Sequence, residues 1–298
     1  MKVLLDKPDS EKRSTLRRVL RAGRRPALIA LLLGGLGYGA WVLWNNVREQ
    51  VAIGPEYQFD PQQIELPPLP AWIHSDIKAQ VIRDAGWGTN LSLLDERLTV
   101  RVAQAFQLNP WVAKVQRVSK RQPRGVQVDL DFRRPVAMVE VAGGLLAVDA
   151  EGTVLPSDDF TAADAQLYPR ISGIQTGPRG PVGTRWGDPG VTAAAQLAAF
   201  LRDSWTTLQL KKIVPQVGAP TDAPERLSFS LVTRGERVLT WGHLPGRETA
   251  GELPASEKLA RLKRHIEESG SLEQGDPLPS LLSPLHHRTA TLPPPKSE

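Results

Sequence analysis

The chain has 298 residues, 41% hydrophobic and 23% charged, which is typical of a folded protein with room for one ordinary domain or two small ones. It contains no cysteine, so disulfides and thiolate chemistry are excluded. Residues 1–25 hold nine basic and three acidic residues and account for the net charge of +5. The rest of the chain is nearly neutral, which argues against a nucleic-acid partner.

An uncharged apolar run occupies residues 26–44. As a helix it spans close to the ~30 Å hydrocarbon core of a bilayer. Because arginines crowd its N-terminal side, residues 1–25 are expected in the cytoplasm and the bulk of the chain in the periplasm, anchored in the cell inner membrane. A cleaved signal peptide is the alternative, but a cut after Ala40 places bulky Tyr38 where a small residue is preferred. The pattern favours an uncleaved single-pass transmembrane helix.

Residues 45–70 are rich in proline and indicate a stalk. Helical periodicity then predicts two amphipathic helices, the first capped by Ser75 and the second by Ser92. The period changes to two in residues 126–132, which predicts a half-buried strand, and residues 111–118 predict another strand before it. Two helices on one face of a three-stranded sheet form an α+β module, which we place at residues 71–142.

A second, β-rich module is expected over residues 143–269. Its predicted elements are a hairpin that joins 145–148 to 153–156, a helix over 191–205, strands over 208–214, 227–232 and 238–241, and a C-terminal helix over 256–269. Prolines interrupt residues 270–298, so a disordered tail is predicted there.

No catalytic residue, cofactor site or metal site is predicted. The five histidines lack a metal-ligand spacing, and the His286–His287 pair lies in the predicted tail. Asp158 and Asp159 are candidates for the acid/base pair of a cell-wall hydrolase, but adjacent carboxylates usually point apart, which favours a solvated turn.

Tryptophans offer either a sugar-stacking platform or core packing, and core packing is the favoured interpretation. The exception is Trp241, which lies beside a predicted edge strand. The tryptophans considered are Trp87, Trp111, Trp186, Trp205 and Trp241.

Three short motifs have a familiar order and spacing. They comprise Pro110, Trp111 and Val112 after the second helix, Arg133, Arg134, Pro135 and Val136 after the second strand, and Asp149, Gly152 and Pro156 at the entrance to the second module. Together they resemble the FtsQ/DivIB family of bacterial cell-division proteins, over roughly residues 26–269. The chain departs from that family at Gln122, where tryptophan is usual, and at Phe132, where glutamate is usual.

The resemblance implies a POTRA-like module followed by a β module in a scaffold that is not an enzyme. It also implies partners similar to the membrane proteins FtsB/DivIC and FtsL and, through them, the septal peptidoglycan synthase. In that family a strand after the last helix pairs with the partner, and its motif is not recognisable here. We therefore expect strand addition at the edge formed by Val238, Thr240 and Trp241.

Two other classes of function stay open on the sequence alone. One is a POTRA-bearing adaptor for envelope assembly or secretion, because fold does not determine function. The other is a membrane-tethered cell-wall enzyme, which requires a cleft with carboxylates or histidine.

Overall fold

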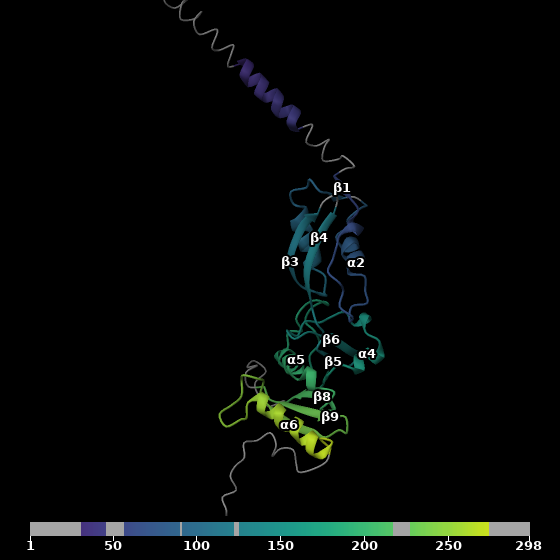
Figure 1. The fold of residues 1–298 in the computed structure, drawn as a ribbon, viewed down its shortest axis with the longest axis vertical. Helices are drawn as coiled ribbons and strands as arrows, with labels where there is room; N and C mark the ends of the chain where they lie inside the picture. The colour runs from purple at the N-terminus through teal and green to yellow at the C-terminus, as the bar shows by residue number, and fades with distance from the viewer. Residues whose placement is uncertain (1–30, 46–56, 90, 122–124, 217–226, 274–298) are drawn as a thin grey trace, which may run out of the picture.

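The elements follow one another along the long axis of the molecule, from an N-terminal helix through two packed units to α6 (Figure 1). This computed structural model describes residues 31–45, 57–89, 91–121, 125–216 and 227–273. The α+β class predicted from the sequence is confirmed.

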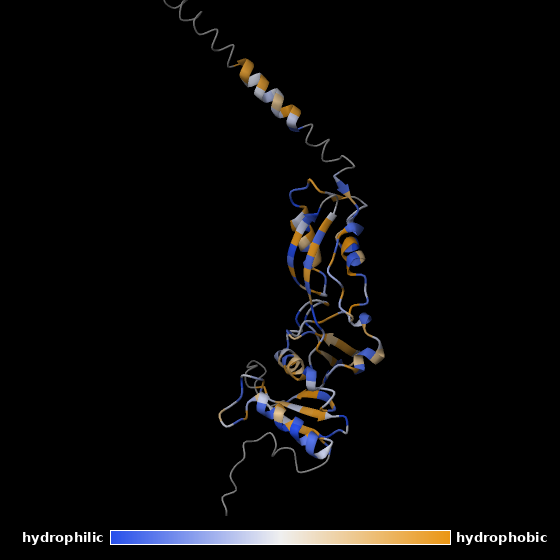
Figure 2. Cartoon of the chain, in the orientation of Figure 1, coloured by the Kyte–Doolittle hydropathy of each residue, from blue (hydrophilic) through white to orange (hydrophobic). Residues whose placement is uncertain are grey.

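The N-terminal helix covers residues 31–45, and Figure 2 shows apolar residues over much of it. Its large apolar side chains, such as Leu31 and Trp44, are exposed. Among the described residues, no helix combines the length and the apolar character that crossing a membrane requires. Residues 1–25 and residues 26–30 of the predicted span lie outside the described residues.

The first unit packs two helices against a β-hairpin. Its elements are β1 (Gln58–Phe59), η1 (Pro61–Gln63), α2 (Ile77–Asp84), β2 (Leu91–Ser92), α3 (Leu98–Gln107), β3 (Val112–Arg121) and β4 (Gly125–Phe132). Apolar residues four apart, Ile77 and Val81 on α2 and Leu98, Val102 and Phe106 on α3, are buried. This spacing places them on one face of each helix, where they contact the alternating apolar residues of β4.

The predicted three-stranded sheet is wrong in one respect, because its third strand is only a single bridge. Glu65 bridges Gln127 of β4 in parallel, and its backbone exchanges hydrogen bonds of 2.9 Å with Val126 and Val128. Pro67 and Pro68 follow almost at once and have no N–H to donate, so the ladder cannot continue.

The predicted helix starts are also corrected. Asp76, one residue after Ser75, caps α2 by accepting from the Ala79 amide at 3.0 Å. Ser92 does not cap α3, because it pairs with Gln58 in the small β1–β2 sheet. The helix α3 begins six residues later and has no side-chain cap.

The second unit is a six-stranded mixed sheet with the order β10-β9-β8-β7-β5-β6. The strands β5, β7 and β8 are parallel to one another, and the other neighbours are antiparallel. The strands are β5 (Ala137–Val141), β6 (Gly144–Val148), β7 (Arg170–Ile171), β8 (Leu210–Pro215), β9 (Phe229–Thr233) and β10 (Val238–Gly242).

Helices α5 (Pro189–Leu201) and α6 (Ala255–Ser269) contribute to the core of this unit together with the sheet. The three-residue η2 (Ser157–Asp159), the short α4 (Ala162–Gln166) and η3 (Arg202–Ser204) connect the larger elements. The predicted strands at 208–214, 227–232 and 238–241 correspond to β8, β9 and β10 with small shifts. The predicted helix at 191–205 ends earlier, at Leu201.

The hairpin predicted between 145–148 and 153–156 is present only in part. Val154 forms an antiparallel bridge to Val148, and the Leu155 amide donates to the Ala147 carbonyl at 2.8 Å. The longer pairing of Gly144–Val148 is with Ala137–Val141. Gly144 has φ of 140°, a conformation that glycine adopts readily, and it allows the chain to reverse immediately after β5.

Candidate functional site

Two regions of the chain are candidates for function: the junction between the two units, where the sequence motifs meet, and the outer edge of β10. At the junction, residues of the second unit enter the core of the first. Met138, Ala147 and Leu155 belong to the same buried cluster as Trp111 and Phe106. The two units therefore share apolar packing and are joined by more than a linker.

Asp159, at the end of η2, is the polar centre of this junction. Its Oδ2 accepts from the Trp111 indole Nε1 at 2.6 Å and from the Ser75 hydroxyl at 2.9 Å. Its backbone carbonyl lies 2.9 Å from the His74 Nδ1. Asp159 is buried whereas Asp158 is exposed, so the two carboxylates do point apart. The predicted solvated turn is nevertheless wrong for Asp159, which connects the second unit to the first.

Both arginines of the motif, Arg133 and Arg134, interact with other residues of the chain. The Arg133 guanidinium donates to Asp149 Oδ2 at 2.7 Å, and Asp149 also accepts from the amides of Glu151 at 3.0 Å and Thr153 at 2.7 Å. The Arg134 guanidinium lies 5.3 Å from the centre of the Trp72 ring, within the range of a cation–π interaction.

The remaining motif residues also have structural roles. Trp111, Val112 and Val136 are buried, and Pro135 is buried beside them. Gly152 has φ of 73°, and a Cβ there would lie 2.7 Å from the Thr192 Oγ1, so no other residue fits without rearrangement.

A Cβ at Gly183 would lie 3.2 Å from the Pro110 Cα, so Pro110 leaves room there for glycine only, and Pro156 directly precedes η2. The motifs thus form or adjoin the junction. Asp159, Ser75 and His74 complete it, and sequence reasoning missed their role because Asp159 reaches Trp111, Ser75 and His74 only through the tertiary fold.

The second candidate region is the outer edge of β10. Among the described residues, β10 pairs with β9 and with no other strand. The Thr233 amide donates to the Arg237 carbonyl at 3.0 Å, so antiparallel alternation directs the N–H and C=O groups of Val238 and Thr240 away from β9. The Val238 and Thr240 side chains are exposed, but Trp241 is only 1% exposed. The expectation that Trp241 is an exception to core packing is therefore wrong.

A buried charged network fixes the end of this edge. Lys258 of α6 is fully buried; its Nζ donates to the Trp241 carbonyl at 2.8 Å and to the Glu252 carboxylate. Glu252 also accepts from the His243 amide at 2.8 Å and the Thr249 amide at 3.0 Å and lies 2.7 Å from the His243 Nδ1.

Burial raises the pKa of Glu252, but the hydrogen bonds from Lys258, Thr249 and His243 outweigh it and lower the pKa to about 2. The carboxylate therefore stays ionised at neutral pH. The sequence does carry a signal for the buried lysine, since Lys258 lies four residues before the buried Leu262 and so on the inward face of α6.

The remaining candidate functional residues are the tryptophans and histidines considered from the sequence. Trp111, Trp186 and Trp205 are buried, as the core interpretation predicts, and Trp87 is half-buried; Trp241, the predicted exception, is buried as well. In the described part of the chain, no group of three or more histidine or carboxylate side chains is placed to hold a metal ion. His286 and His287 lie outside the described residues.

Comparison with known proteins gives two relatives, and no family model matches the chain. The chain is 30% identical over 145 residues to a protein named Cell division protein FtsQ from Geobacter sp. (strain M21), an alignment that covers 49% of this chain and 47% of that protein. It is 30% identical over 177 residues to a protein of the same name from Anaeromyxobacter sp. (strain K), covering 57% and 52%. The chain spans about half the length of the curated relatives it matches. These matches confirm the resemblance that the motifs indicate.

Proposed function

We propose that this chain acts as an FtsQ-type cell-division protein, a noncatalytic scaffold that spans the inner membrane once and binds other division proteins outside it. The support for the division role is the similarity to two proteins named Cell division protein FtsQ, together with the motif residues that lead to it. The support for the anchor is the uncharged run at residues 26–44 and the arginines before it.

The observation that supports partner binding is the outer edge of β10, which pairs with no strand of the described chain. Outward N–H and C=O groups at Val238 and Thr240 have hydrogen-bonding capacity that a partner strand can satisfy. The exposed Val238 and Thr240 side chains lie on the same face and offer side-chain specificity.

Lys258 limits the length of this edge. The pairing of β10 with β9 shifts between Thr240 and Gly242, which leaves Trp241 in a bulge, and the Trp241 carbonyl accepts from Lys258. A partner strand therefore has a short segment to pair with, centred on Val238 to Thr240, and α6 lies at one end of it. The partners expected on the resemblance are small single-pass proteins similar to FtsB/DivIC and FtsL, which link the scaffold to the septal peptidoglycan synthase.

Two variants at one position test this edge. Thr240→Pro removes the outward N–H, whereas Thr240→Val keeps the backbone donor and changes only the side chain. In a pull-down from solubilised membranes, we expect the wild type and Thr240→Val to recover the small single-pass partners. Thr240→Pro should recover at least 10-fold less of them. Equal recovery by all three proteins would reject strand addition at β10.

Cellular and enzymatic assays test the class of function. Depletion of the protein is expected to produce filamentous or unseparated cells. Recovery of outer-membrane assembly factors alone would favour an envelope adaptor, and turnover of a wall fragment by the purified protein would favour an enzyme. Either result would reject the scaffold proposal.

A further inference from the structure

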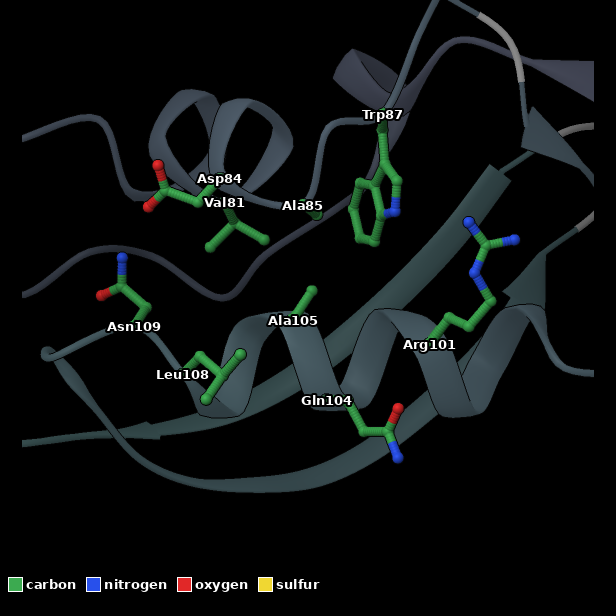
Figure 3. Close-up of a pocket in the computed structure, with 9 residues that line it drawn as sticks. All are labelled: Val81, Asp84, Ala85, Trp87, Arg101, Gln104, Ala105, Leu108 and Asn109. Carbon is green, nitrogen blue, oxygen red and sulfur yellow. The ribbon is translucent and has the colours of Figure 1, made fainter.

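A groove lies between α2 and α3 of the first unit, away from β10 and outside the family motifs. It has a volume of about 280 Å³. Figure 3 shows it with Trp87 reaching over the space between the two helices. Its lining residues are Val81, Asp84, Ala85, Trp87, Arg101, Gln104, Ala105, Leu108 and Asn109.

The groove exists because the two helices present short side chains toward it. Ala85 at the end of α2 and Ala105 of α3 lie on opposite sides, and Figure 3 shows Val81 on the α2 side. Trp87 is half-buried and forms a wall at one end. The result is an apolar recess that reaches Val81, a core residue.

An exposed stripe on α3 extends this recess. Val100, Gln104 and Leu108 are spaced four residues apart and therefore lie on one face of the helix. Val100 is 55% exposed and Leu108 is 84% exposed, so this face of α3 presents two large aliphatic side chains to solvent. A stripe with this spacing is the surface that a second helix packs against.

The ends of the groove differ in charge. At one end Arg101 pairs with Asp95 at 3.1 Å, so its charge is balanced. At the other end Asp84 is exposed and forms no ion pair with any described residue. Figure 3 shows Asp84, Asn109 and Leu108 at the end of the groove opposite Arg101. An occupant with a basic residue at the Asp84 end is electrostatically complementary.

We propose that the α2–α3 groove binds an amphipathic helix of a partner protein, which inserts a large apolar side chain between Ala85 and Ala105 and places a lysine or arginine beside Asp84. The exposed stripe on α3 has the four-residue spacing on which a second helix packs, which favours a helix as the occupant. The backbone groups of α2 and α3 are engaged in their own helices, so strand addition cannot occur here and binding must use side chains. This surface is distinct from β10, and the inference does not depend on strand addition there.

A photocrosslink in living cells tests the identity of the occupant. A photoreactive phenylalanine derivative replaces exposed Gln104 in the full chain, and the crosslinked peptide is sequenced by mass spectrometry. We expect an adduct within a segment of another protein that has apolar residues at helical spacing and a lysine or arginine within one turn of the crosslinked position. An adduct to a second copy of this chain, to an extended segment or to lipid, or the lack of an adduct, would overturn the proposal.

Groove variants in the same crosslinking protein establish that the recess itself is used. Ala105→Trp fills the recess and is expected to reduce the adduct at least 10-fold, while Arg83→Trp, on exposed α2 surface outside the groove, leaves it unchanged. Asp84→Lys is expected to reduce the adduct without changing the unfolding midpoint, because Asp84 is exposed. When the partner's basic residue is replaced by glutamate, crosslinking to the Asp84→Lys variant should be restored. If crosslinking is not restored, the assigned orientation of the helix is wrong.

Discussion

The junction between the units and the β10 edge use hydrogen-bonding groups in opposite ways. At the junction, Asp159, Trp111 and Arg133 are directed inward and bind partners within the chain. At β10, the backbone groups of Val238 and Thr240 are directed outward, where the described chain offers them no strand. The comparison shows that the motif residues hold the two units together at the junction, whereas the edge proposed to bind partners carries no sequence motif. Substitutions at the junction should therefore change stability, and substitutions at the edge should change binding.

The largest effect is expected from Trp111→Ala. The side chain is fully buried and its indole donates to Asp159, so truncation creates a cavity and leaves a buried carboxylate short of a donor. We expect a loss of about 3–5 kcal/mol in unfolding free energy, measured by urea denaturation of the full chain. Trp87→Ala, at a half-buried tryptophan, is the matched control and should cost less than half as much. Equal losses would contradict a special role for the junction.

Asp149→Ala is expected to lower the unfolding free energy by less than Trp111→Ala does. The substitution removes the partner of Arg133 and the acceptor for the Glu151 and Thr153 amides, so three groups lose a hydrogen bond. The expected cost is about 2–4 kcal/mol. Asp158→Ala, which changes an exposed carboxylate of the same unit, should change stability by less than about 0.5 kcal/mol. Thermal denaturation of both variants measures the difference.

Glu252→Gln should change the pH dependence of stability as well as its size. The folded-state pKa of Glu252, about 2, lies below its ordinary value of 4.5, so its ionisation stabilises the fold above that value. This contribution is lost as the pH falls from about 4.5 to about 2. We expect a cost of about 2 kcal/mol at pH 6 that shrinks toward pH 2, measured by denaturation across this range. A difference from wild type that is constant with pH would show that Glu252 is not ionised in the network.

The smallest effect on stability is expected from Thr240→Pro. The lost N–H points away from β9, so the substitution should cost no more than about 1 kcal/mol while it removes partner recovery. Leu239→Pro is the informative contrast, because the Leu239 N–H points toward β9 and its side chain is buried, so this substitution should cost about 3 kcal/mol or more. Similar costs at the two positions would contradict the assigned alternation of β10.

Much of the local structure could be predicted from residue periodicity. The alternation of Val126, Val128 and Leu130 identified β4, and the apolar spacing in α6 identified the C-terminal helix within one residue. The predicted caps failed at Ser92, because pairing with β1 overrides its local preference for a helix start. Val238 and Thr240 lie on β10, an outer strand of the described sheet, but the burial of Trp241 depends on packing that its neighbours in sequence do not reveal.

The sequence by itself determined the apolar run near the N-terminus, the α+β class and most helices and strands, because these depend on residues a few positions apart. Only the tertiary structure decided that Asp159 binds Trp111 across 48 positions and that Lys258 is buried against Trp241. Such contacts join groups whose separation along the chain carries no periodic signal. They form because burial leaves polar groups without water, and the partner that replaces the water is whichever group the fold brings within reach.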